Sequence, residues 1–306
     1  GEGLVFDSEG TALQGITTGS IWDPNFARTR VSLIDSCAGG EKIELWVEAA
    51  ANSLFGVFTD PDPAQENPKR HGWFDAKVEK MQVGIFDKEL WHLYLDARIL
   101  LGLVKRLDEK SVRQSRAIIA LNNCVNAFGD NLRRVKQARE CLKTELSKPA
   151  APSDLNVAAI GHAHIDTGWL WPVRETVRKC ARTYATQLSI IDNYPDYIFG
   201  ASQPQHYQFT KDNYPELYER IKKAVKSGNW EAQGGMWVEA DCNLISGESM
   251  VRQLLHGKNF FKDEFGVDVD NLWLPDVFGY SAALPQILKK SGINYFLTQK
   301  LSWSQF

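Results

Sequence analysis

The sequence predicts an α/β protein that starts with a small β domain, continues through a helical segment and ends in a larger domain of alternating strands and helices. Residues 42–48 alternate apolar and polar side chains at period two, as a half-buried strand does. After residue 154, short apolar runs alternate with segments of helical periodicity. This alternation favours parallel β/α units joined by right-handed crossovers. We therefore expect three segments, over residues 1–86, 87–153 and 154–306.

The first segment is expected to form a β-sandwich-like domain. A second, less regular alternation of apolar and polar residues covers residues 77–85 and predicts another strand. Between the two expected strands, Pro61, Pro63 and Pro68 are loop signals.

The second segment is predicted to be helical. Asp87 is a suitable N-cap for a first helix. Its apolar stripe consists of Leu90, Tyr94, Ile99, Leu100 and Leu103. Two further helices are expected over residues 109–128, ended by Gly129, and over 131–146. Basic and acidic residues are mixed in the last of these, which indicates a solvated face rather than a nucleic-acid patch. Residues 148–153 are typical of a linker.

The third segment carries the strand and helix alternation. We expect strands at 157–160, 197–200, 230–233, 272–274 and 295–297. Helices are expected at 175–192, 215–226, 247–265 and 283–290, with Ser246 as an N-cap and Gly266 as a stop. In domains of this kind, the chemistry lies at the carboxyl ends of the strands.

Composition limits the class of protein. The 306 residues are 43% apolar and 24% charged, as in a soluble globular protein. A net charge of −3 gives no reason to expect nucleic acid or an anionic membrane as a partner. No apolar run could span a bilayer, and the first residues do not form a signal peptide. The five scattered cysteines lack a C-x-x-C pair and favour a reducing, cytoplasmic location.

The first candidate site follows the strand expected at 157–160. His162, His164 and Asp166 are spaced by two, so on extended backbone their side chains point the same way. Nitrogen and oxygen donors in this combination suit Zn²⁺ or a similar divalent ion. Trp169 adds a flat apolar face on which a sugar ring can stack. The alternative is a strand-end loop whose histidines hydrogen-bond to buried backbone groups.

The second candidate is Asp276, which follows the strand expected at 272–274. A lone aspartate at a strand end is more often a helix N-cap. Here Gly279 and Ser281 lie closer to the expected helix start, so Asp276 is not needed as a cap. Asp241 follows another strand, and we expect it on the same rim as Asp276 and the histidine motif.

Other polar residues are weaker candidates. Glu239 and Asp241 could contact a substrate or orient a ligand, and a structural role is equally consistent with their positions. For Gln203, Gln205 and His206, which follow a strand, we expect a loop role. His71, His92 and His256 lie outside the motifs and are interpreted as surface or packing residues.

Four ordered blocks, at residues 161–171, 234–249, 274–280 and 296–303, resemble the class II α-mannosidases of glycoside hydrolase family 38. The resemblance is to the cytosolic or vacuolar-type branch. It is strong from about residue 155 onward and weaker over the first 150 residues, through residues 13–15 and 52–56. Four blocks in order are far more specific than any one of them.

The resemblance implies a distorted (β/α)7 barrel-like catalytic domain, incomplete in this chain. It implies zinc-dependent, retaining hydrolysis of non-reducing α-mannosyl residues of oligosaccharides, with Co²⁺ or another divalent ion as a substitute, and homo-oligomers. By motif position, His164 and Asp166 match metal ligands, and Asp276 matches a nucleophile that is also a ligand. His162 matches a residue that supports the ligands. Trp169, Phe278 and Lys300 match residues that contact the substrate.

The chain also departs from the family pattern. The family's acid/base aspartate and last metal-binding histidine lie downstream of the four blocks, and no residue here matches them. We therefore expect a fragment that is inactive alone. Ser304 stands where the family pattern has asparagine after the tryptophan. Two alternatives remain. A metal-dependent carbohydrate deacetylase would need an extra histidine pair, absent between residues 167 and 200. The other alternative is a non-catalytic carbohydrate-binding fragment.

Overall fold

The structure is a computed structural model that describes residues 2–17, 27–50, 78, 80–149 and 155–303. The chain forms two compact units. One unit combines Gly1–Lys77 with Ala159–Phe306, and the other is Val78–Ala158. Among the described residues, no helix is both long enough and apolar enough to cross a membrane.

The predicted β structure at the N-terminus is confirmed as a small antiparallel sheet. Its strands are β1 (Glu2–Asp7), β2 (Ala12–Ile16) and β3 (Leu45–Ala50), in the order β2-β1-β3. Strand β3 begins three residues later than predicted. The strand expected at 77–85 is wrong over its described residues, because none of the described strands pairs with it and the side chains of Met81, Val83 and Ile85 are exposed. The loop prolines at 61, 63 and 68 lie outside the described residues.

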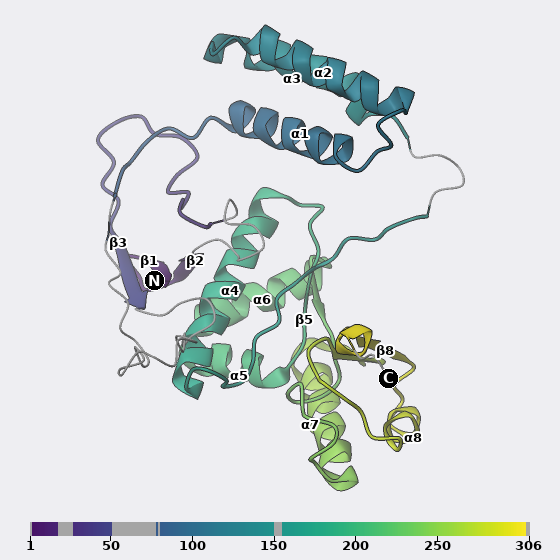
Figure 1. The fold of residues 1–306 in the computed structure, drawn as a ribbon. Helices are drawn as coiled ribbons and strands as arrows, with labels where there is room; N and C mark the ends of the chain where they lie inside the picture. The colour runs from purple at the N-terminus through teal and green to yellow at the C-terminus, as the bar shows by residue number, and fades with distance from the viewer. Residues whose placement is uncertain (1, 18–26, 51–77, 79, 150–154, 304–306) are drawn as a thin grey trace, which may run out of the picture. The chain divides into compact units, whose positions relative to one another are not determined.

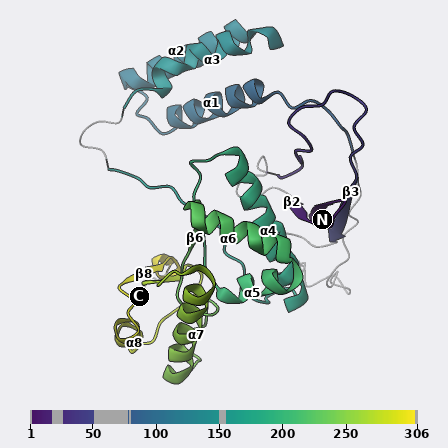
Figure 2. The ribbon, with the colours of Figure 1, turned by 180° about the vertical axis from the view of Figure 1, so that it is seen from behind.

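The second unit contains three helices that lie side by side (Figures 1 and 2). They are α1 (Lys88–Val104), α2 (Val112–Phe128) and α3 (Val135–Leu146), the last preceded by the short helix η2 (Leu132–Arg134). The Asp87 carboxylate caps α1 as predicted, accepting from the Leu90 N–H at 3.0 Å. Helix α2 starts later than predicted because Ser111 caps it. Gly129, with φ of 49°, ends it as expected.

The core of this unit only partly follows the predicted stripe. Leu100 is fully buried, but Tyr94 and Ile99 are 44% and 63% exposed. Leu93, outside the predicted stripe, is buried instead. The linker expected at 148–153 falls mostly on residues that the structure does not describe.

The parallel β/α units expected after residue 154 are confirmed. Strands β4 (Gly161–His162), β5 (Phe199–Ala201) and β6 (Trp230–Ala232) form one parallel sheet in sequence order. Strands β7 (Asn271–Leu274) and β8 (Tyr295–Thr298) form a second. The Asn271 side chain connects the two sheets, donating to Gln233 Oε1 at 3.1 Å and accepting from the Gly234 N–H at 3.3 Å. The described strands do not close a barrel.

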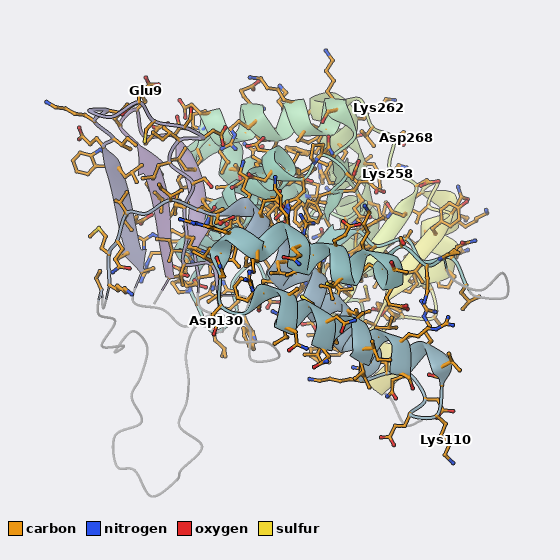
Figure 3. The ribbon with its side chains drawn as sticks, turned by 90° about the horizontal axis from the view of Figure 1, so that it is seen from above. Glu9, Lys110, Asp130, Lys258, Lys262 and Asp268 are labelled. Atoms are coloured by element: carbon orange, nitrogen blue, oxygen red, sulfur yellow. The ribbon has the colours of Figure 1, made fainter. Side chains whose placement is uncertain are left out.

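Helices alternate with these strands. They are α4 (Val173–Asn193), α5 (Pro204–Asn213), α6 (Pro215–Ser227), α7 (Gly247–Phe265) and α8 (Leu284–Lys290), followed by the short helix η3 (Lys300–Trp303). Ser246 and Gly266 bound α7 as predicted. The loop that leaves α7 is tied back by Lys258, whose ammonium lies 3.0 Å from Asp268 Oδ1 (Figure 3).

Two predictions in this segment are wrong. The strand expected at 157–160 starts only at Gly161, where pairing with Phe199 begins, and Val157 is 85% exposed. The loop expected around Gln205 is instead the start of α5. Pro204 is the first residue of this helix, and the helix residues Tyr207 and Thr210 are buried. Proline at a helix start is a signal that could have revealed α5.

Packing brings the carboxyl ends of the strands together. One core cluster surrounds Trp230, whose indole N–H donates to the Tyr207 hydroxyl at 2.8 Å between β6 and α5. A second cluster, which includes Met236, Leu254 and Leu274, lies around β7. The loops that follow β4, β6 and β7 therefore emerge at one edge of this unit.

Candidate metal centre

Three predicted ligands lie together at this edge. His164 and Asp166 belong to the loop after β4, and Asp276 belongs to the loop after β7. One ligand atom of each lies within 4.8 Å of the others. His164 Nε2 is 3.3 Å from Asp166 Oδ1 and 3.5 Å from Asp276 Oδ2. One imidazole nitrogen and two carboxylates at this spacing can surround a divalent ion.

Glu239 approaches the other ring nitrogen of His164. Its Oε2 lies 2.8 Å from His164 Nδ1, and its Oε1 accepts from the Ser202 hydroxyl at 2.9 Å. Apart from this close approach to the imidazole, the buried Glu239 Oε2 makes no hydrogen bond. A carboxylate behind a histidine fixes which ring nitrogen faces a metal and raises its basicity. The residues present therefore fit a metal ion on the Nε2 side of His164.

Charge in the cluster also favours a cation. Burial disfavours the protonated ring, but the carboxylates of Asp166 and Glu239 outweigh this effect and raise the pKa of His164 to about 10. The Lys300 ammonium lies 2.8 Å from Asp276 Oδ1. With His164 neutral, as a metal ligand must be, three carboxylates and one ammonium carry a formal charge of −2. A divalent cation would neutralise that charge.

His162 does not join the three ligands. Strand β4 ends at His162, so the alternation that was expected to align all three side chains stops there. Its ring packs against Trp273, with ring centroids 4.9 Å apart, and its buried Nε2 has no partner. Burial lowers the pKa of His162 to about 4. His162 is therefore a neutral residue packed beside the cluster.

Two aromatic side chains near the cluster are open to solvent. Trp169 is 54% exposed and Phe278 is 80% exposed. The ammonium of Lys300 lies 4.7 Å from the centre of the Phe278 ring. Both rings could contact an apolar sugar face while the polar groups of the cluster contact hydroxyls.

Thr176 holds the turn that carries Trp169. Its Oγ1 accepts from the Gly168 N–H and from the Trp171 indole N–H, both at 3.0 Å, and donates to the Asp166 carbonyl at 3.3 Å. Gly168 has φ of 80°, which a glycine adopts readily. The first turns of α4 therefore hold both the turn of Trp169 and the loop after β4 that carries His164 and Asp166, called the metal loop below.

The weaker candidates divide into two groups. Asp241 is exposed and closes a turn, accepting from the N–H groups of Asn243 and Leu244. Glu239, Gln203 and His206 instead lie next to the metal loop. Their importance depends on contacts across the fold, and only the block containing Glu239 was a signal in the sequence. His92 and His256 lie on α1 and α7, and His71 is outside the described residues.

Two known domain families match this chain. Residues 154–306 match the glycosyl hydrolases family 38 N-terminal domain, and residues 1–81 match the alpha-mannosidase jelly roll domain.

Relatives match nearly the whole chain. Alpha-mannosidase G of Dictyostelium discoideum is 41% identical, over 99% of this chain and 27% of its own length. Alpha-mannosidase 2C1 of Homo sapiens is 38% identical, over 99% and 28%. Alpha-mannosidase of Saccharomyces cerevisiae is 34% identical, over 89% and 27%. The chain thus spans little more than a quarter of the length of these relatives. Because residues 154–306, half of the chain, match the family 38 N-terminal domain, the chain belongs to glycosyl hydrolase family 38.

Proposed function

We propose that the protein is a zinc-dependent retaining α-mannosidase that removes non-reducing α-mannosyl residues from oligosaccharides. The observation that carries this proposal is the cluster of His164, Asp166 and Asp276, with Glu239 behind the histidine. The cluster lies within the residues that match the family 38 domain.

His164, Asp166 and Asp276 would hold the ion. A mixed nitrogen and oxygen set suits zinc, and cobalt accepts the same donors. When bound, the ion would coordinate sugar hydroxyls and stabilise developing charge. His162 would support the ligands from outside the set by filling the space between the metal loop and Trp273.

Asp276 is proposed as the nucleophile. In a retaining mechanism, a carboxylate attacks the anomeric carbon while the glycosidic C–O bond breaks and a general acid protonates the leaving oxygen; water then hydrolyses the glycosyl-enzyme and frees the carboxylate. The Lys300 ammonium pairs with Asp276 Oδ1 and thereby orients the carboxylate. Trp169 and Phe278 would stack against the sugar, and Lys300 would also contact it. No residue among the 306 matches the family's acid/base aspartate or last metal-binding histidine, so we propose that further sequence supplies them and that these residues alone are inactive.

The proposal includes the domain organisation. Residues 1–86 would form the β-sandwich-like domain, 87–153 the helical segment and linker, and 154–306 the first part of a distorted (β/α)7 barrel. Homo-oligomers and a cytoplasmic location belong to it as well. Five cysteines without a disulfide are consistent with a reducing compartment.

The test measures bound metal and mannose release from an aryl α-mannoside by the full-length natural protein. We expect about one zinc per chain, lost with activity in His164→Ala. We expect Asp276→Asn to lower turnover by on the order of 10⁴-fold, as removal of a catalytic group does. Asp241→Asn is the control, because asparagine keeps the turn acceptor and lies outside the cluster.

Three results would contradict the proposal. Full activity in metal-free protein would exclude a catalytic zinc. Bound metal with release of acetate from an acetylated sugar, but no mannose release, would favour the deacetylase. Sugar binding without any hydrolysis would indicate a carbohydrate-binding protein.

A further inference from the structure

Gln203 has a backbone conformation that is unusual for its residue type. In the described part of the chain, it is one of two residues other than glycine with a positive φ, at 66°. This conformation costs a side-chain-bearing residue about 1–3 kcal/mol. Gln203 lies between β5 and α5, does not cap the helix with its side chain and is only 3% exposed. Glycine would adopt this backbone more easily, so the amide itself must account for a glutamine here.

The Gln203 amide connects two loops of the candidate metal centre. Its Nε2 donates to the Ile165 carbonyl at 2.9 Å, between His164 and Asp166. Its Oε1 accepts from the backbone N–H of Glu239 at 3.2 Å. One side chain therefore joins the loop with two proposed ligands to the residue behind His164.

A third contact completes the network. The Thr167 hydroxyl donates to Gln203 Oε1 at 3.2 Å and lies 2.8 Å from Nε2 of the buried His206. If His206 Nε2–H donates to Thr167, both hydroxyl bonds are satisfied. Fully satisfied buried polar networks rigidify their surroundings. The metal loop is thereby anchored to α5 as well as to α4.

We infer that Gln203 is a positioning residue that fixes the His164 ring between Glu239 and the metal position. This inference depends on the proposed metal site. The bond to Ile165 sets the peptide between the two ligands, and the bond to Glu239 sets the carboxylate that holds His164 Nδ1. A structural filler would need neither bond, whereas a positioning residue needs both.

The test uses Co²⁺ as a probe in the full-length protein, with Gln203→Ala and Gln203→Gly. Cobalt affinity and the visible absorption of bound cobalt report the site, and thermal unfolding of metal-free protein reports stability. We expect both variants to bind cobalt about 10- to 100-fold more weakly, as for other residues that support metal ligands, with an altered spectrum. We expect Gln203→Gly to be more stable than Gln203→Ala, since glycine relieves the strain, but no tighter in cobalt binding.

Asp130 provides a matched control. It is the other described residue with a positive φ, at 54°, and it lies exposed beyond the end of α2, at the opposite end of that helix from Lys110 (Figure 3). Asp130→Gly relieves the same type of strain in the other compact unit, so cobalt affinity and spectrum should not change.

The outcomes separate the two hypotheses. Wild-type affinity and spectrum in Gln203→Gly would overturn the role of Gln203 and leave the metal site intact. The same conclusion would follow if affinity simply tracked stability across the two variants. A wild-type protein that binds neither cobalt nor zinc would overturn the proposed metal site, and the role of Gln203 with it.

Discussion

Two charged clusters of the same unit differ in how their charges are compensated. In the first, Arg182 contacts Glu2 at 2.7 Å and Glu175 at 2.5 Å, and Lys179 lies 3.3 Å from Glu2. All four side chains are buried, and their formal charges cancel. In the second, the candidate metal centre, the side chains are partly exposed and the carboxylates outnumber the ammonium group. The charges of the first cluster compensate one another, whereas those of the second leave room for a cation. The two clusters therefore lead to different predictions.

The largest expected effect comes from breaking the balanced cluster. Arg182→Leu should lower the free energy of unfolding by about 3–5 kcal/mol, because Glu2 and Glu175 would lose their shared partner in a buried site. The measurement is urea unfolding, with and without zinc. Lys143→Ala, which removes an exposed pair with Glu140, should change stability by less than about 1 kcal/mol. Equal effects of the two substitutions would show that the buried cluster is not special.

The unbalanced cluster should respond to metal instead. Zinc at 100 times its dissociation constant should stabilise the wild-type protein by about 2.7 kcal/mol, because it binds only the folded state. Asp166→Asn should abolish most of this gain, and a chelator should reverse it. Thermal unfolding with and without zinc measures both. Stabilisation of Asp166→Asn by zinc to the wild-type extent would show that the ion binds elsewhere.

The next prediction concerns the protonation of the buried His206, which lies next to the candidate metal centre. Burial, and then the nearby charge of His164, lowers the pKa of His206 to about 3. Below pH 6.5 the unfolded chain therefore binds a proton at this position that the folded chain does not, so the free energy of unfolding decreases as the pH is lowered. From pH 8 to pH 5.5 this contribution amounts to about 1.4 kcal/mol.

The measurement compares metal-free wild type with His206→Gln in urea at both pH values. Other histidines contribute to both proteins, so the difference isolates His206. The wild type should lose about 1.4 kcal/mol relative to the variant between pH 8 and pH 5.5. A difference that does not change with pH would mean that His206 titrates normally.

Thr176 gives the smallest expected effect and shows to which cluster the start of α4 belongs. Thr176→Val removes three hydrogen bonds to the metal loop and the Trp169 turn and should cost about 1 kcal/mol of stability. We expect a higher KM for an aryl α-mannoside with little change in kcat, because the turn of Trp169 loosens. The exposed Thr144→Val on α3 is the control. Lower stability with an unchanged KM would assign Thr176 to the structural side.

Local signals made much of this fold predictable. Helix α7 has the bounds that Ser246 and Gly266 indicate, since caps act within a few residues. The strand expected at 77–85 fails because alternation says nothing about whether a partner strand is available. Strand β4 begins after its apolar run because pairing with β5, not hydrophobicity, decides where it starts.

The site was predictable to a similar degree. The H-x-H-x-D spacing and the Asp276 block identify residues that the fold brings together. Glu239 contacts His164, which is 75 positions away in the chain, and Gln203 contacts Ile165, which is 38 positions away. Pairings at that separation leave no local pattern, and the positive φ of Gln203 is not visible in a sequence.

The junction between the two parallel sheets has a mechanical consequence. No ladder joins strands β6 and β7; the Asn271 side chain connects them, and an isolated bridge between Cys242 and Tyr280 connects the segments that follow them. His164 and Asp166 follow the first sheet, and Asp276 follows the second. An ion bound by all three would hold the two sheets together at this junction. Removal of the ion would then weaken the junction as well as the proposed catalysis, and the amide hydrogens of β6 and β7 would exchange faster.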